Sequence, residues 1–271
     1  MKYTFLIIAA FALTACSTEI KEIKKQDPFE KIKGCFLLYN LKTNVFEKII
    51  GDKCEERFPA CSTFKVPLAV MAFDSEILTD EIQVIKWDGE KRWLDSWNHD
   101  QNAKSWMANS VVWFSQELTP KIGHNKIQKY LLNFRYGNQD MSAGITQAWL
   151  NRPNDPKGSL AINAYEQVEF MKRLWRNELP VSKKSMELTR QITFLETSPN
   201  GYRLSGKTGS NFYDDSHKIQ LGWFIAHVSK GEKEYIVATN FSDVQPFETT
   251  SFGGPRAKEI TKALLNEFGL W

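Results

Sequence analysis

The stretch PACSTFKVP, residues 59–67, decides how the rest of the chain is interpreted. It contains a Ser-x-x-Lys pair, Ser62 and Lys65, at the start of the longest helical region. Residues three apart share one face of a helix, so Lys65 can point back at Ser62. Pro67 is tolerated only near a helix start, because deeper in a helix it would clash with the carbonyl four residues back. We therefore expect a helix to begin at Ser62, where unpaired N–H groups could stabilise an oxyanion. An N-cap serine followed by a solvated lysine is the ordinary alternative for this tetrapeptide alone.

Strand-like segments lie on both sides of this helical region. Apolar, β-rich runs at 34–39 and 45–50 flank the turn at 41–44 and predict a hairpin. Three further runs at 202–208, 219–228 and 234–241 predict an antiparallel meander, and a last helix is expected from Pro255 to about Phe268. Between the hairpin and the meander, helices are expected at 160–177 and at 182–195. A further helix is expected around one apolar stripe, formed by Ile127, Tyr130, Leu131 and Phe134.

The order strands, helices, strands, helix predicts an α+β fold, with one antiparallel sheet built from both ends of the chain. We expect a sheet subdomain at about 31–61 plus 201–271 and a helical subdomain at about 62–200. Together they form one domain at 31–271, because 271 residues suffice for a sizeable buried core.

Composition and charge exclude several classes of partner. The net charge is +3 and 42% of residues are hydrophobic, and basic residues do not alternate with aromatic ones along one face. The chain is therefore not expected to bind nucleic acid. Its four histidines are scattered without metal-ligand spacing, so no metal site is expected.

A second motif, Lys207-Thr208-Gly209, is placed at the end of a predicted strand. An edge strand can bind an extended acyl-amide substrate, and glycine permits close approach, although the tripeptide alone also suits a strand ending in a turn. A Ser-x-x-Lys followed far downstream by Lys-Thr-Gly is the signature of penicillin-recognising serine enzymes. Between the two motifs lie, in order, Ser110-Val111-Val112, Tyr136-Gly137-Asn138 and Trp149. This ordered set closely resembles the class D β-lactamases, or oxacillinases, from about Gly34 to the C-terminus.

The resemblance implies a β-lactamase that uses carbon dioxide, as a lysine carbamate, and no other cofactor. Ser62 would attack the lactam carbonyl to form an acyl-enzyme, and carbamylated Lys65 would be the general base. Trp149 would donate its indole N–H to the carbamate. The N–H groups of Ser62 and Ser210 would form the oxyanion hole, and Ser110, near Lys207, would transfer a proton to the lactam nitrogen. Lys207, Thr208 and Arg256 would bind the substrate carboxylate, and Gly209 would allow its close approach. Val112 and Phe64 would form apolar walls, and Tyr136 and Asn138 would shape the site.

Two other activities share these motifs. A penicillin-binding sensor domain of the same fold, or a transpeptidase or carboxypeptidase, would be acylated without turnover. The latter enzymes carry Ser-x-Asn as their second motif, but the segments 96–98 and 198–200 are poorly placed to flank Ser62. A class A enzyme would show Glu-x-x-Leu-Asn, which does not occur in the chain. Hydrolysis of β-lactams, with antibiotic resistance as its consequence, is therefore the favoured interpretation.

Cysteines and the N-terminus indicate an exported protein. A short positive start and an apolar run from Thr4 to Ala15 predict a signal peptide at 1–15, too short to span a bilayer. Leu13-Thr14-Ala15-Cys16 resembles the lipobox of bacterial lipoproteins. It predicts a lipid on Cys16, a tether at 16–30 and the periplasmic face of the outer membrane as location. An ordinary signal peptide cut near Ala15 is the alternative.

Three cysteines remain after Cys16, and an oxidising compartment permits a disulfide among them. Cys54 and Cys61 flank a short segment just before Ser62, where a bridge would restrain the approach to that serine. Cys35 lies on a predicted buried strand, where a free thiol is common. We therefore expect a Cys54–Cys61 disulfide and a free Cys35.

The lipid anchor is tested by Cys16→Ser. Wild-type protein should fractionate with membranes and carry a modified N-terminal cysteine, whereas Cys16→Ser should be released or mislocalised, because it lacks the acylated thiol. Membrane fractionation and mass spectrometry of the N-terminal peptide measure both properties. Soluble wild-type protein with an unmodified N-terminus contradicts the prediction.

Overall fold

The structure is a computed structural model that describes residues 29, 32–155, 157–213, 215–246 and 249–271. The predicted signal peptide and lipobox, and all of the predicted tether except Phe29, lie outside the described residues. In the part of the chain that is described, no helix is long and apolar enough to cross a membrane.

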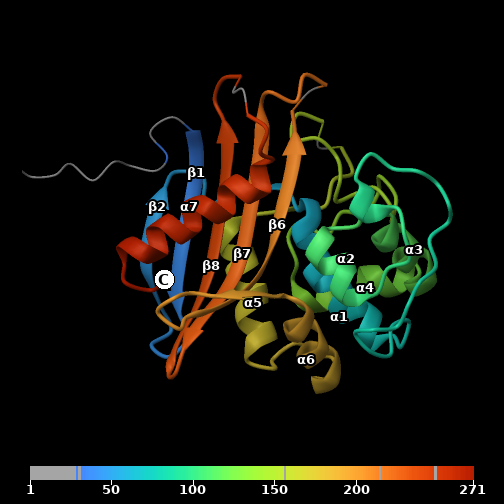
Figure 1. Cartoon of the computed structure of the whole chain (residues 1–271), viewed down its shortest axis with the longest axis horizontal. Helices are drawn as coiled ribbons and strands as arrows, with labels where there is room; N and C mark the ends of the chain where they lie inside the picture. Colours follow the sequence, from blue (N-terminus) through green and yellow to red (C-terminus); the bar gives the residue numbers. More distant parts are fainter. Residues whose placement is uncertain (1–28, 30–31, 156, 214, 247–248) are drawn as a thin grey trace, which may run out of the picture.

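One six-stranded sheet organises the molecule, and it is built from both ends of the chain as predicted (Figure 1). All neighbouring strands pair antiparallel. In spatial order the strands are β2 (Val45–Gly51), β1 (Ile32–Asn40), β8 (Lys233–Asp243), β7 (Gln220–Lys230), β6 (Arg203–Phe212) and β5 (Phe194–Thr197). The α+β fold class, the N-terminal hairpin and the β6-β7-β8 meander are thereby confirmed.

The sheet separates two hydrophobic cores because side chains alternate along each strand. Along β1, Cys35 and Leu37 belong to the larger core on the helical side, whereas Phe36 and Leu38 belong to the smaller core. Helix α7 (Gly253–Glu267) covers the smaller core from the opposite face. This is the predicted C-terminal helix.

Helices fill the segment between the two sheet-forming parts of the chain. Their bounds are α1 (Lys65–Asp74), α2 (Ala103–Asn109), α3 (Val112–Ile122), α4 (His124–Phe134), α5 (Ala164–Trp175) and α6 (Lys183–Ile192), with short 3-10 turns η1 (Cys61–Phe64) and η2 (Asp95–Trp97). The apolar stripe predicted around Ile127 is the buried face of α4. A two-stranded ribbon of β3 (Phe58–Pro59) and β4 (Ala161–Ile162) lies at the start of the nucleophile segment.

Three predicted elements differ from the structure. The helix expected at 160–177 is α5, which begins only at Ala164 after the strand β4 at Ala161–Ile162. The expected helix at 182–195 ends at Ile192, and Phe194 begins the edge strand β5. The strand predicted at 202–208 continues to Phe212, so Lys207-Thr208-Gly209 lies within β6 rather than at its end. Polar residues 210–211 resemble a loop in sequence, but their backbone pairs with β7.

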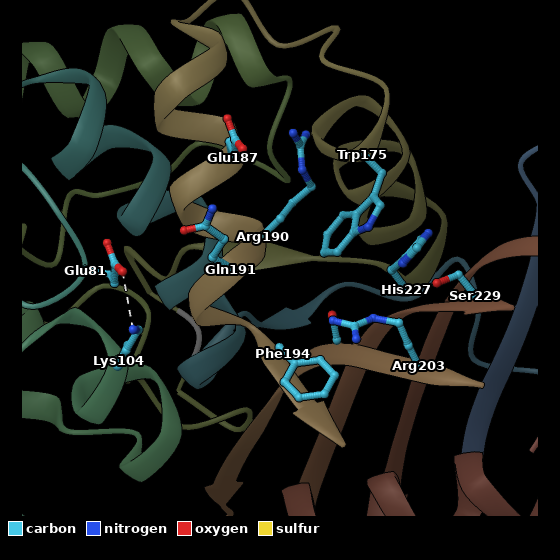
Figure 2. A pocket seen from close by; sticks show the side chains of 11 residues that line it. Glu81, Lys104, Trp175, Glu187, Arg190, Gln191, Phe194, Arg203, His227 and Ser229 are labelled. Carbon is cyan, nitrogen blue, oxygen red and sulfur yellow. Dashed lines mark ion pairs between the residues drawn. The ribbon is translucent and has the colours of Figure 1, made fainter. Parts of the chain in front are cut away.

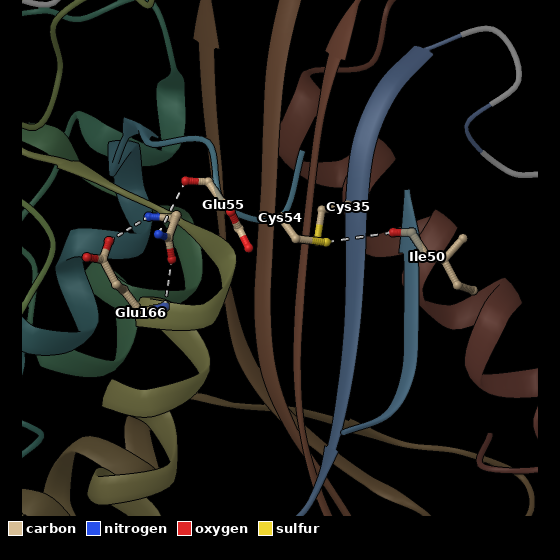
Figure 3. The surroundings of a disulfide bond; sticks show 6 residues. Cys35, Ile50, Cys54, Glu55 and Glu166 are labelled. Atoms are coloured by element: carbon tan, nitrogen blue, oxygen red, sulfur yellow. Dashed lines mark hydrogen bonds between the residues drawn. A yellow bond between two sulfur atoms is a disulfide. The ribbon is translucent and has the colours of Figure 1, made fainter. Parts of the chain in front are cut away.

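The predicted Cys54–Cys61 disulfide is wrong. Cys35 on β1 is bonded to Cys54, and Cys61 is a free, buried thiol (Figure 3). Cys54 follows β2, and the hairpin register brings it back beside β1, which linear spacing did not reveal. Cys61 instead points inward, where its thiol donates to the carbonyl of Pro59 at 3.2 Å.

Removal of the bridge should destabilise the protein. The bonded cysteines are 19 residues apart, and closing a loop of that size in the unfolded chain is worth about 3 kcal/mol. Cys35→Ser with Cys54→Ser should therefore lower the free energy of unfolding by about 2–4 kcal/mol in chemical denaturation. Non-reducing peptide mapping of wild type should recover a Cys35–Cys54 peptide, and a Cys61-containing disulfide would contradict the structure.

Candidate active site

Ser62 and Lys65 meet at the junction of η1 and α1. The Nζ of Lys65 donates a hydrogen bond to the Oγ of Ser62 at 3.0 Å. Pro67 is the third residue of α1, where the missing N–H has no intrahelical partner to lose. The helix start predicted from PACSTFKVP is thus confirmed, with the 3-10 turn η1 as its first turn.

Both motif lysines are buried. The Lys65 side chain is fully enclosed, and burial, reinforced by the nearby charge of Lys207, holds the pKa of its amine well below the ordinary 10.5. Burial also lowers the pKa of Lys207 to about 7. A lowered pKa favours the neutral amine of Lys65, and only a neutral amine can accept a proton or react with carbon dioxide.

Backbone contacts from distant segments hold the turn that carries Ser62. Cys61 has a φ of 50°, a left-handed conformation that is costly for a residue with a side chain. Its N–H donates to the carbonyl of Trp149 at 2.9 Å, and the N–H of Ala60 donates to Leu160 at 2.9 Å. These bonds from the 148–162 segment keep the strained turn in one conformation.

Strand β6 passes directly beside the turn at Gly209. A Cβ added there would lie 3.1 Å from the Cβ of Cys61 and 3.3 Å from the backbone nitrogen of Ser62. Any side chain at this position would force the turn to shift by a few tenths of an ångström. The glycine of the Lys-Thr-Gly motif therefore allows β6 to approach the turn this closely. β5 pairs with β6 only as far as Ser205, so among the described residues no strand covers the edge of β6 beside Ser62.

Side chains alternate along β6, so Lys207 and Gly209 face Ser62 while Thr208 and Ser210 face α7. The Oγ of Ser210 accepts the N–H of Gly254 at 2.8 Å, which joins β6 to the first turn of α7. The Nζ of Lys207 donates to the carbonyl of Thr208 at 3.0 Å.

Arg256 lies in the first turn of α7, where it forms a bidentate pair with Asp243 at 2.7 and 2.9 Å. Its guanidinium also lies over the ring of Phe241. Asp243 is a residue that the sequence did not single out, because a single aspartate at a strand end carries no motif. The pair fixes the guanidinium at this edge of the sheet before any substrate arrives.

Ser110 occupies the junction between α2 and α3. It is the C-terminal cap of α2 with a φ of 56°, and this left-handed conformation ends one helix before Val112 begins the next. Ser110 therefore lies in a tight turn between two helices and not within a helix. Among the described residues no hydrogen bond joins it to Ser62, whose hydroxyl is bonded to Lys65, so its role depends on substrate bound between the two serines.

Tyr136-Gly137-Asn138 shapes the segment that supports the turn. The amide of Asn138 donates to Ser159 at 2.8 Å and accepts the N–H of Ala161 at 3.0 Å. Gly137 has a φ of 55°, and a Cβ there would lie 2.2 Å from the carbonyl of Ala161. Because 160–162 in turn contacts Ala60 and β3, the motif acts on Ser62 through backbone.

Trp149 provides a buried donor without an acceptor. Its side chain is fully enclosed, and its indole Nε1 has no hydrogen-bond partner among the described residues. The ring packs on Phe64, the neighbour of Lys65, with centroids 5.0 Å apart. A buried unpaired N–H costs free energy, so this position fits a bound anion that accepts from it.

A separate pocket of about 630 Å³ lies between α6, the start of β6 and the C-terminal end of α5 (Figure 2). Its lining includes His227, stacked on Trp175 with centroids 4.7 Å apart. Burial lowers the pKa of His227 to about 3, so the imidazole is neutral. The pocket lining contains neither Ser62 nor Lys65, so this cavity is separate from the reactive groups.

Comparisons with known proteins agree with this arrangement. The family model of the penicillin binding protein transpeptidase domain matches residues 24–266. The chain is 37% identical to Beta-lactamase OXA-1 of Escherichia coli, over 98% of this chain and 96% of that protein. It superimposes on the class D beta-lactamase structure from Bacillus subtilis with a TM-score of 0.79 and 32% identity, over 91% and 97% of the two chains. It is also 31% identical to Regulatory protein BlaR1 of Bacillus licheniformis, over 88% of this chain but only 37% of that protein.

Gly209→Ala should slow acylation without unfolding the protein. The new methyl group would press on the turn by a few tenths of an ångström and displace Ser62, and such misplacement costs about tenfold to hundredfold in rate. Rapid-quench mass spectrometry with benzylpenicillin measures the acylation rate, and thermal unfolding checks the fold. Ser205→Ala, on the same face of β6 but distant from the turn, serves as the matched control. An unchanged acylation rate in Gly209→Ala would show that the close approach has no catalytic role.

Proposed function

Because the chain belongs to the class D β-lactamases, we propose that Ser62 is its nucleophile and that Lys65, carbamylated by carbon dioxide, is its general base. The protein is a serine β-lactamase that hydrolyses the amide of β-lactam rings. The observation that carries the proposal is the 3.0 Å hydrogen bond between the buried amine of Lys65 and the Oγ of Ser62.

The residues around Lys65 fit a carbamate. Burial lowers the pKa of its amine and so favours the neutral form that reacts with carbon dioxide. Trp149 contributes a buried indole N–H that lacks an acceptor and could hold the carbamate oxygens. When bound, the carbamate would supply an anionic base at neutral pH.

Each further step uses groups of the chain itself. Ser62 loses its proton towards Lys65 and adds to the lactam carbonyl, whose oxyanion the N–H groups of Ser62 and Ser210 stabilise. Ser110 passes a proton to the departing nitrogen, with Lys207 nearby. Water then attacks the acyl-enzyme and gives its proton to the base at Lys65.

Lys207 and Thr208 bind the substrate carboxylate, with Arg256 completing the positive edge of the site. Arg256 is already paired with Asp243. The Oγ1 of Thr208, although on the α7 side of the strand, lies 3.3 Å from the Nζ of Lys207, so we assign most of the direct binding to Lys207 and Thr208. Val112 and Phe64 supply the apolar wall, and Tyr136 and Asn138 support the turn from behind.

We also propose that the enzyme is exported and anchored to the periplasmic face of the outer membrane through a lipid on Cys16. The apolar run before Leu13-Thr14-Ala15-Cys16 supports this. Antibiotics that cross the outer membrane would then be hydrolysed before reaching their targets, so the enzyme would confer β-lactam resistance on its host.

The mechanism is tested by turnover of a chromogenic cephalosporin at varied bicarbonate. Sustained hydrolysis should fall when carbon dioxide is stripped or the pH is lowered, since protonation of the Lys65 amine opposes carbamylation. Added bicarbonate should restore it. Trp149→Phe, which keeps the ring but lacks the N–H, should need more bicarbonate than wild type for half-maximal rate.

Lys65→Ala is the control, and it should be inactive at every bicarbonate concentration. Full activity of wild type in buffer free of carbon dioxide would exclude the carbamate while leaving the hydrolase intact. A single burst without turnover would instead identify a penicillin-binding sensor or transpeptidase.

A further inference from the structure

Gln167 is a fully buried amide on the first turns of α5, close behind the turn that carries Ser62. Its Nε2 donates to the Oγ1 of Thr63 at 2.8 Å, and its Oε1 accepts the hydroxyl of Tyr136 at 3.5 Å. Thr63 and Tyr136 are themselves fully enclosed. A polar network so completely removed from water is sensitive to the loss of any one member.

The network continues to the backbone of the nucleophile turn. The Oγ1 of Thr63 donates to the carbonyl of Ala60 at 2.5 Å, and the N–H of Thr63 reaches the same carbonyl at 3.2 Å. These two bonds join Thr63 back to Ala60 and so close the turn that contains Cys61 and Ser62. Because Cys61 is held in a left-handed conformation, the turn needs such restraints to keep the N–H of Ser62 in one direction.

The start of α5 is itself fixed, which makes Gln167 a rigid support. Asn163 and Glu166 form a capping box, and Glu166 also forms an ion pair with Arg57 just before β3. The N–H of Ala164 donates to the carbonyl of Cys54 at 3.1 Å, and Cys54 is bonded to β1. Figure 3 shows Cys54, Glu55 and Glu166 where this segment meets α5.

We propose that Gln167 is a positioning residue for the oxyanion-hole donor of Ser62 and acts through Thr63. The proposal rests on Ser62 being the acylated serine. Gln167 touches neither substrate nor the reacting atoms. Its amide determines where Thr63 places the Ala60 carbonyl, and thereby the direction of the Ser62 N–H that receives the developing negative charge.

Gln167→Met tests the proposal, because it keeps the length and volume of the side chain without its polar groups. Acylation by benzylpenicillin, followed by rapid-quench mass spectrometry, should slow about tenfold to hundredfold, the cost of a misplaced group, because the oxyanion-hole donor is displaced and not removed. The inhibition constant of phenylboronic acid, which forms a tetrahedral adduct on Ser62, should rise by a similar factor. Gln128→Met is the matched control, since Gln128 also lies on a helix and its Nε2 donates to a backbone carbonyl, that of Gln139.

Gln167→Glu adds a readout that a purely structural role would not produce. A buried glutamic acid has a raised pKa, and only its protonated form can donate to Thr63. Its acylation rate, relative to wild type at the same pH, should therefore rise as the pH falls through that pKa. A ratio that stays constant with pH among folded molecules contradicts the proposal.

The outcomes separate this inference from the proposed function. If wild type is not acylated on Ser62, the proposed function fails. If wild type is acylated and Gln167→Met is acylated equally fast with a lowered melting temperature, Gln167 only stabilises the fold and the inference fails. Should Gln167→Met not fold, Thr63→Val removes the same link one step closer to Ser62 and should show the same slow acylation.

Discussion

Removal of the Lys65 amine from water is the constraint on which the rest of the structure depends. An ammonium group enclosed without a carboxylate partner is costly, so the side chain is driven towards its neutral form. The larger core supplies that enclosure, with helix α1 buried along nearly its whole length. A lysine at the same position on a solvated helix would remain a cation and could not activate Ser62.

The same enclosure requires that the serine be presented from a strained turn supported on several sides. Trp149 and Leu160 bond to the backbone before Ser62, β6 passes beside it at Gly209, and Trp223 donates to the carbonyl of Pro59 at 3.2 Å. These supports come from segments far apart in sequence. Catalytic geometry here is therefore a property of the whole domain, and the motifs mark the places where its parts meet.

Much of the fold could be predicted because it is encoded locally. Apolar, β-rich runs separated by turns and polar loops indicated the hairpin and the meander, the spacing around Ile127 indicated α4, and Pro67 located the helix start. The Cys35–Cys54 bridge could not be read from spacing, since it depends on the register of β1 against β2. Gln167 was missed for a related reason. On an amphipathic helix one glutamine looks like any solvated residue, and only the packing of α5 against η1 shows that it is buried.

The uncovered edge of β6 has a consequence for folding and solubility. Unpaired backbone groups on an edge strand can recruit a strand from another molecule. Here β5 pairs with the edge up to Ser205, and at the far end the side chain of Asn211 donates to the carbonyls of Leu150 and Asn151. The N–H of Gly206 also donates to the carbonyl of Thr193 at 2.8 Å, so the bare stretch is residues 207–210, roughly 13 Å. That length suits one amide-bearing small molecule, and a short exposed edge is a poor template for a strand from another molecule.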